Sequence, residues 1–331
     1  MSTVTALRPS VVEAKQRLAE GHERIRKRHE AGAPGIQICA ALTELLDTVL
    51  LELYRTALAD LDESGPERLE KVCSLLAHGG SGRQDIAPYS DVDLMLLVAP
   101  GGEPRAERLA ERLLRDVFDV GLQLGLTVRT AAEACRLART DATICTALIE
   151  SRRLAGNEEL FDAFRRRFQK EMMRRADSLL ALIQESRDEE RAQYGETVYL
   201  LEPNIKRSRG GLRDVQFIRW LGFLKHGAAD PDGQRLRDVL TRDDHATLLQ
   251  DWEFLLRLRN ELHFHAGKSN DLLDRSEQVR IAKAFGFAGK EGLLPVEQFM
   301  SEYFRRTESV SGLAARLAAA ARSTPLWNKA A

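Results

Sequence analysis

The sequence predicts an α/β (α+β) core with a small mixed sheet, followed by an all-helical domain, so that the chain is mostly helical overall. Two short apolar segments, 72–77 and 91–98, predict buried strands on either side of a glycine-rich turn. A helix with an apolar stripe at 105–120 leads to 122–130, whose alternation predicts a third strand. After Ala131 the apolar residues recur at helical spacing, and no further strand is expected.

Composition excludes several classes of protein. The 331 residues are 44% hydrophobic, and no apolar run approaches the ~18 residues of a membrane-spanning helix. A formal net charge of −1 excludes a chain-wide basic field for nucleic acid. The N-terminus lacks the apolar core of a secretory signal, and the cysteines form no C-x-x-C pair, as is typical of reduced thiols. We therefore expect a cytoplasmic protein that binds neither membrane nor nucleic acid.

Helices account for most of the remaining chain. Two are expected before the first strand, at 10–28 and 36–60. Those expected after the third strand cover 131–139, 141–153, 158–192, 213–225, 235–265, 275–285 and 295–320. We expect three parts: N-terminal helices at 1–70 that pack on the core, the α/β domain at 71–156 and the helical domain at 157–331.

Two aspartates open the second strand, in the sequence S-D-V-D-L. Residues i and i+2 of a strand point to one face, so Asp91 and Asp93 project together, about 6–7 Å apart. A buried strand avoids unpaired carboxylates, and a shared Mg²⁺ would satisfy both of these. The alternative is a helix cap or a surface edge, which explains Asp91 better than Asp93.

The glycine-rich turn precedes this strand, with Gly79, Gly80, Ser81 and Arg83 in the sequence G-G-S-G-R. Glycines allow backbone N–H groups to approach an anion closely, and an arginine adds a permanent positive charge. A tight strand-to-helix turn is the alternative. The nearby D-x-D favours phosphate binding, because a phosphate cradle beside paired carboxylates suits nucleotidyl transfer.

A third carboxylate is usual in sites of this kind, on a neighbouring strand. The strand predicted at 122–130 contains none, and Gln123 stands at the expected place. Asp119 lies just before that strand and is a candidate third catalytic carboxylate, or it simply ends the helix. Asp85 is a weaker candidate and is better explained as a loop residue that holds Arg83 or a backbone amide.

A polar, glycine-bearing stretch at 197–213 interrupts the helical half. Such a break between long helices is disfavoured unless it binds something. Lys206 and Arg213 are positioned to meet phosphate, and Asp214 to cap a helix or orient them. An interhelical loop with solvated charges explains the pattern equally well.

Taken together, these motifs resemble the bacterial PII-protein uridylyltransferases. The turn and D-x-D are similar to that family's signature G-G-x-G-R-x-E-L-x-P-x-S-D-x-D-L. Further similar motifs follow in the same order along the chain. They are V-R-T at Val128, T-A-L-I-E-S-R-R-L-A-G-N at Thr146, Y-G-E-T-V-Y-L-L-E-P-N-I-K at Tyr194, G-G-L-R-D-V-Q at Gly210 and L-R-N-E-L-H-F-H-A-G at Leu258.

The resemblance implies a polymerase-β-like nucleotidyltransferase domain followed by a helical domain. It implies an enzyme that uses UTP and Mg²⁺ to transfer UMP to a tyrosine of a PII signalling protein. Asp91 and Asp93 would hold the metal and, with Asp119, form the catalytic set. The residues expected to bind the nucleotide are Gly79, Gly80, Ser81, Arg83, Ser90, Asn204, Lys206, Gly210, Gly211, Arg213 and Asp214.

The sequence departs from the family at Ser81, Asp85 and Gln123, where tyrosine, glutamate and an acidic residue are usual. There is no His-Asp dipeptide, so uridylyl removal is not expected, and neither is glutamine sensing. Two alternatives remain. One is transfer of UMP or AMP to another protein or a small molecule, and the other is a non-catalytic nucleotide-binding regulator.

Overall fold

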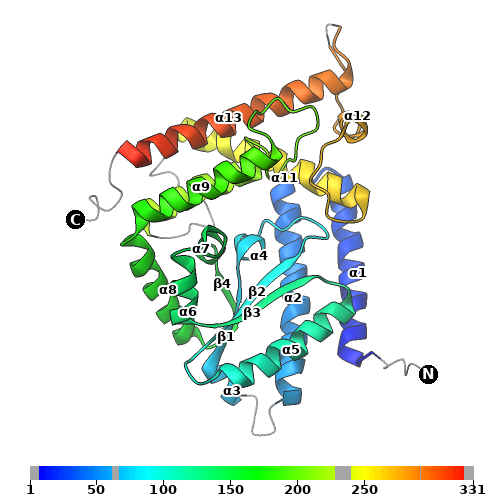
Figure 1. Cartoon of the computed structure of the whole chain (residues 1–331). Helices are drawn as coiled ribbons and strands as arrows, with labels where there is room; N and C mark the ends of the chain where they lie inside the picture. Colours follow the sequence, from blue (N-terminus) through cyan, green and yellow to red (C-terminus); the bar gives the residue numbers. More distant parts are fainter. Residues whose placement is uncertain (1–6, 62–66, 228–239, 291, 324–331) are drawn as a thin grey trace. The chain divides into compact units, whose positions relative to one another are not determined.

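The computed structural model describes residues 7–61, 67–227, 240–290 and 292–323. The chain is mostly helical (Figure 1) and forms two compact units. Unit 1 holds the residues up to 33 together with 37–171, and unit 2 holds 34–36 and the residues from 172 onward. The sequence placed the start of the helical domain at 157 instead. Across the described residues, no helix has the length and apolar character needed to cross a bilayer.

One mixed four-stranded sheet forms the centre of unit 1 (Figure 1). Its strands are β1 (Cys73–Ala77), β2 (Val92–Val98), β3 (Leu124–Thr130) and β4 (Arg152–Gly156), in the order β3-β2-β1-β4. β2 and β3 are parallel, while β1 is antiparallel to both β2 and β4. The three predicted strands and the small mixed sheet are thus confirmed.

The expectation that no strand follows Ala131 is wrong. The segment 141–153, predicted as one helix, forms α7 (Ala142–Ile149) and the start of β4. The Asp141 side chain caps α7 by accepting from the Ile144 N–H at 2.9 Å. The β4 sequence R-R-L-A-G carries too few apolar residues to show a strand pattern. Its extended form comes from pairing with β1, which is far away in sequence.

Helices cover the sheet of unit 1 and are, in chain order, α1 (Pro9–Glu30), α2 (Gly35–Leu61, its first two residues in unit 2), α3 (Glu67–Val72), α4 (Gly79–Arg83), α5 (Glu103–Val120), α6 (Ala131–Ala138), α7 and α8 (Glu158–Met173). The helix predicted at 36–60 forms as α2, and its residues Val49 and Leu53 are fully buried. Tyr54 of this helix places its hydroxyl 3.7 Å from the Cys73 sulfur at the start of β1.

The helix with an apolar stripe predicted at 105–120 forms as α5, but not all of its large apolar residues are buried. Leu109, Leu113 and Val117 are fully buried, whereas Leu114 and Phe118 are 45% and 77% exposed. The buried three follow an i, i+4, i+8 row that faces the sheet. The exposed pair lies on the adjacent row, which apolar character alone did not distinguish.

Unit 2 consists of helices and a polar loop in its described part. The helices are α9 (Ala176–Tyr194), α10 (Leu212–His226), α11 (Arg242–Ala266), α12 (Arg275–Ala284) and α13 (Pro295–Ser323). The single helix expected at 158–192 is two helices, α8 and α9. The start of the helix expected at 235–265 lies outside the described residues. The loop between α9 and α10 is tied to the segment after α11 by an isolated bridge between Asn204 and Leu272.

Candidate active site

The glycine turn of unit 1 is one turn of helix, α4, directly after β1. Gly79 has φ +57°, a left-handed conformation in which a side chain would be strained. A Cβ at Gly82 would come within 1.9 Å of the Glu150 carbonyl oxygen at the end of α7. These two glycines therefore allow the backbone path and its packing, and Gly80 lies half-buried between them.

Asp93 places its carboxylate in a gap between two glycines. A Cβ at Gly79 would lie 3.2 Å from one carboxylate oxygen, and a Cβ at Gly125 of β3 would lie 3.0 Å from the other. The Asp93 N–H donates to the Ser81 hydroxyl at 3.2 Å, and its carbonyl accepts from the His78 N–H at 3.1 Å. The main chain of Asp93 is thus fixed, and its carboxylate packs against two positions where a side chain would crowd it.

Asp91 lies at the open rim of the sheet. It is exposed, as are Gln123 and Gly125 on the neighbouring chain segment. In the parallel register Asp93 pairs with Gly125, and the Val92 N–H donates to the Gln123 carbonyl at 2.9 Å. β3 therefore contributes no carboxylate to this rim. Nowhere in the described residues do three or more His, Cys, Asp or Glu side chains gather as a metal cage.

Two carboxylates nevertheless fit a magnesium ion that is shared with a nucleotide. Mg²⁺ retains several waters and is usually held by one or two carboxylates plus substrate phosphates, not by a cage made only of protein. The lack of side chains at Gly79 and Gly125 lets the Asp93 carboxylate lie close to their backbone, and Asp91 is exposed to solvent. These two side chains are the ones that would hold the ion.

Arg83 forms a buried ion pair with Asp85. Their Nε–O distance is 2.8 Å, and the two side chains are only 6% and 7% exposed. The interpretation of Asp85 as the residue that holds Arg83 is confirmed. Because this arginine is already oriented, any contact of its guanidinium with a nucleotide would use its remaining N–H groups.

The two serines expected at the nucleotide occupy different settings. Ser81 is 3% exposed, and besides the bond to Asp93 its carbonyl accepts from Arg152 Nε at 3.1 Å and Nη2 at 2.9 Å. Through these contacts Ser81 holds the backbone of Asp93 and the side chain of Arg152 in place. Ser90 is half-buried and closes a turn by donating its N–H to the Ala87 carbonyl at 3.2 Å.

Asp119 lies exposed near the end of α5. It lies near Asp116, whose pKa is raised mainly by burial, with Arg8 opposing and Asp119 adding to the increase. None of these contacts joins Asp119 to Asp91 or Asp93, so its catalytic role stays a prediction.

His78 is a residue of the site that sequence reasoning missed. Burial lowers the pKa of its imidazole, although the Asp93 charge works in the opposite direction. Its Nδ1 is buried without a hydrogen-bond partner among the described residues. A single histidine before a glycine turn has no spacing pattern, so only the structure brings it to Asp93.

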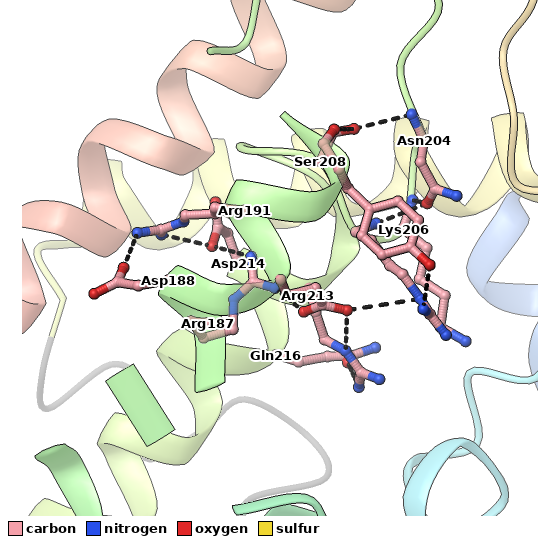
Figure 2. Close-up of polar contacts among 12 residues, drawn as sticks. Arg187, Asp188, Arg191, Asn204, Lys206, Ser208, Arg213, Asp214 and Gln216 are labelled. Carbon is pink, nitrogen blue, oxygen red and sulfur yellow. Dashed lines mark hydrogen bonds and ion pairs between the residues drawn. The ribbon is translucent and has the colours of Figure 1, made fainter. Parts of the chain in front are cut away.

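Asn204 organises the polar loop of unit 2 (Figure 2). Its side-chain oxygen accepts from the Lys206 N–H at 3.1 Å and the Arg207 N–H at 2.9 Å. Its own N–H donates to the Ser208 hydroxyl at 2.9 Å. The amide oxygen of Asn204 is therefore used inside the loop.

Gly210 and Gly211 allow close backbone packing after this turn. Gly210 has φ +77°, and a Cβ there would lie 2.1 Å from the Thr307 carbonyl oxygen of α13. A Cβ at Gly211 would lie 2.6 Å from the Ile205 carbonyl oxygen. Both positions exclude a side chain for reasons of packing.

Asp214 is the buried anchor of the same loop (Figure 2). It is fully buried, and one carboxylate oxygen accepts from Arg187 at 2.8 Å and Arg191 at 3.0 Å. The other accepts from the Gly210 N–H at 2.7 Å. Burial alone would raise the pKa of Asp214, but the two arginines hold it below its ordinary value. We assign Asp214 to the frame of the loop.

Lys206 and Arg213 differ from these framing residues. Lys206 is half-buried, and desolvation followed by the charge of Arg259 lowers the pKa of its ammonium to about 8. Arg213 donates to Gln216 at 2.8 Å and lies 3.7 Å from a Glu190 oxygen. The structure thus separates these two candidates from Asn204, Gly210, Gly211 and Asp214.

Comparison with known proteins gives a family match within unit 2 and relatives that align with most of the chain. Residues 177–318, within unit 2, match the family model described as GlnD PII-uridylyltransferase. A bifunctional uridylyltransferase/uridylyl-removing enzyme of Caulobacter vibrioides is 33% identical over 301 residues, which cover 90% of this chain and 32% of that protein. An enzyme of the same name from Azospirillum brasilense is 31% identical over 97% of this chain and 35% of its own length.

These alignments reach beyond the matched domain. Because 90% or more of the chain is covered, they include the sheet and the D-x-D of unit 1 as well as the loop of unit 2. The chain spans about a third of the length of the curated relatives that it matches. Residues 177–318 therefore form a domain of the GlnD PII-uridylyltransferase family, and most of the chain is similar to part of the uridylyltransferase/uridylyl-removing enzymes.

Proposed function

We propose that this chain is a Mg²⁺-dependent nucleotidyltransferase that moves UMP from UTP to a tyrosine of a PII-type signalling protein. The names of the relatives, which are uridylyltransferases, support the reaction class. The observation that carries the proposal is the Asp93 carboxylate, which lies between Gly79 and Gly125 on the open rim that it shares with Asp91.

Asp91 and Asp93 would hold the ion, which when bound neutralises triphosphate charge and polarises the α-phosphate. The protein's part is positioning. Ser81 and His78 fix the backbone of Asp93, so its carboxylate needs little reorganisation when the nucleotide binds. Gly79 and Gly125 let that carboxylate lie against their backbone, a position that a side chain at either residue would disturb.

Arg83 would add positive charge on the triphosphate side through the N–H groups that Asp85 does not use. Gly80 lies in α4 and Ser90 in the turn just before Asp91, and both would approach the nucleotide through their backbone. The acceptor phenol has an ordinary pKa near 10, so its proton must be removed as it attacks. Asp119 is our candidate for that base, since it is a solvent-exposed carboxylate near the start of β3.

The test is incubation of the whole chain with α-labelled UTP, Mg²⁺ and a PII-type protein. We expect label on the acceptor, and a loss of at least about 100-fold in Asp93→Asn, because an ion held in place supplies several kcal/mol of transition-state stabilisation. Glu111→Gln removes an exposed carboxylate from α5 and is the matched control. No label from any nucleotide on any acceptor would refute the proposal.

A second candidate rests on Gln123 and Gly125, which leave β3 without a carboxylate at the rim. A site with two carboxylates suits a regulator that binds nucleotide without transferring it. That candidate predicts a thermal shift with UTP and Mg²⁺ but no release of pyrophosphate. Transfer of AMP, or transfer to a different acceptor, would appear in the same assay as label from ATP or on another protein.

A further inference from the structure

The turn just before Asp91 contains a backbone conformation that tyrosine rarely adopts. The Ser90 N–H donates to the Ala87 carbonyl at 3.2 Å and closes a four-residue turn with Pro88 and Tyr89 at its centre. Tyr89 has φ +59°. Proline at the second position and a left-handed residue at the third are features of a type II turn, which favours glycine or asparagine at the third. A tyrosine in this place is strained, so other contacts must hold it there.

The strain is confined to the connection between α4 and β2. Among the described residues other than glycine, positive φ angles occur only at Gln84 and Tyr89, which lie near the two ends of this connection. Between them, Ile86 and Ala87 are 3% and 0% exposed. Backbone strain of this kind persists where the surroundings fix the conformation, and it is frequent at functional sites. The connection is therefore a rigid piece that ends at the rim of the sheet.

The contact that holds Tyr89 comes from α1. The rings of Tyr89 and His22 meet edge to face, with centroids 5.5 Å apart and an interplanar angle of 79°. Such an arrangement is favourable for aromatic pairs. Burial lowers the pKa of the His22 imidazole, so its ring is uncharged at neutral pH and the contact is an aromatic one. Next to His22, Gly21 is buried against the Leu45 side chain of α2, so α1 is itself closely packed at this point.

We propose that Tyr89 is a positioning residue, whose ring contact with His22 holds the turn 87–90 and thereby places Asp91 at the rim. Asp93 is fixed by bonds of its own backbone to His78 and Ser81. Asp91 lies outside that pair of bonds, exposed and one residue after the turn. Its place therefore depends on the turn and, through Tyr89, on α1.

This role rests on the proposed function, in which Asp91 shares a magnesium ion with Asp93. Mg²⁺ demands near-ideal octahedral geometry, so a small displacement of one carboxylate weakens its binding. Loss of the contact between Tyr89 and His22 should therefore raise the Mg²⁺ concentration that transfer requires. Once Mg²⁺ saturates the site, the rate of transfer should be that of the wild type.

Hydrogen exchange of the whole chain without nucleotide tests the contact independently of any activity. In His22→Ala we expect the protection of the Ser90 and Val92 amides to fall at least about tenfold, while the amides of 94–98 in β2 keep theirs. His22→Phe keeps an aromatic ring and should restore the protection. Lys15→Ala, which changes an exposed residue of the same helix, should leave it unchanged.

These variants also separate positioning from general stability. Equal protection in the wild type and His22→Ala, a loss spread evenly over β2, or a loss that His22→Phe does not restore would overturn the proposal. The exchange result decides the matter even if the wild type transfers no UMP, an outcome that would refute the proposed function alone.

The transfer assay adds a second measurement. Tyr89→Asn tolerates the left-handed backbone but lacks the ring. Tyr89→Asn and His22→Ala should each raise the Mg²⁺ concentration for half-maximal transfer several-fold and leave kcat at saturating Mg²⁺ unchanged. The double variant should be no worse than either, because both remove one contact. A lower kcat at saturating Mg²⁺ with an unchanged Mg²⁺ dependence would contradict the placement of Asp91 by Tyr89.

Discussion

Asp214 offers a sharp test of how the polar loop is held. Asp214→Asn keeps the shape of the side chain and an oxygen for the Gly210 N–H, but it removes the charge that faces Arg187 and Arg191. Arg187 is only 4% exposed, so its guanidinium would keep Glu190 as a partner but lose its fully buried one. The perturbation therefore isolates the buried charge.

The expected cost follows from burial. Breaking a buried ion pair by removing one partner costs about 3–5 kcal/mol, because a buried charge is left uncompensated. Glu190 remains beside Arg187, so we expect about 3 kcal/mol for Asp214→Asn. Asp188→Asn is the matched control, since Asp188 is 74% exposed and pairs with Arg191 at 3.4 Å. Exposed pairs of this kind contribute about 0–1 kcal/mol.

Urea unfolding followed by tryptophan fluorescence measures the effect in the correct unit. All three tryptophans lie after residue 172 in the sequence, and Trp220 and Trp252 belong to the described part of unit 2. A loss of less than about 1 kcal/mol in Asp214→Asn, or equal losses in Asp214→Asn and Asp188→Asn, would refute the assignment of Asp214 to a buried frame.

Three further predictions concern the loop and the rim. Lowering the pKa of Lys206 from 10.5 to about 8 means that the folded chain binds fewer protons than the unfolded chain between these values. Lys206→Met should therefore be more stable than the wild type below pH 8, by up to about 3 kcal/mol, because each unit of pKa shift corresponds to 1.36 kcal/mol. Urea unfolding at a series of pH values should show this difference in stability vanish as the pH rises to about 10.5. Gly210→Ala should destabilise unit 2 by more than about 2 kcal/mol, because the new Cβ would lie 2.1 Å from the Thr307 carbonyl oxygen. Gly312→Ala, inside α13, should instead stabilise unit 2 by about 0.5–1 kcal/mol. A similar change in stability for both variants would contradict the packing argument. Gln123→Glu adds a carboxylate opposite Asp91 and should lower the Mg²⁺ concentration needed for half-maximal UMP transfer several-fold. An unchanged Mg²⁺ dependence would show that residue 123 does not face the ion.

The parts of the fold that local patterns determine were predictable from the sequence. The helix α2 and the strands β1, β2 and β3 are confirmed, because buried apolar residues leave a pattern that the sequence shows directly. β4 was missed because its extended form depends on pairing with β1, and R-R-L-A-G carries no period of its own. The exposure of Phe118 was likewise unpredictable, since it depends on which row of α5 faces the sheet.

In the candidate site, too, local sequence patterns predicted some features, while others depend on residues that are distant in the sequence. The D-x-D spacing predicted Asp91 and Asp93 on one strand, but the gap around Asp93 depends on Gly125, which reaches it only through the parallel pairing of β2 and β3. In the loop of unit 2, Lys206 and Asp214 both stood as charged motif residues. Only burial and partners distinguish the half-buried ammonium from the carboxylate that two arginines enclose.

The most direct test of the central claim is transfer of label from α-labelled UTP to a PII-type protein by the wild type, Asp93→Asn and Glu111→Gln. We predict Mg²⁺-dependent label on the acceptor with the wild type and Glu111→Gln, and at least about a 100-fold loss with Asp93→Asn. Label that persists in Asp93→Asn at the wild-type rate would contradict the assignment of the reaction to this carboxylate.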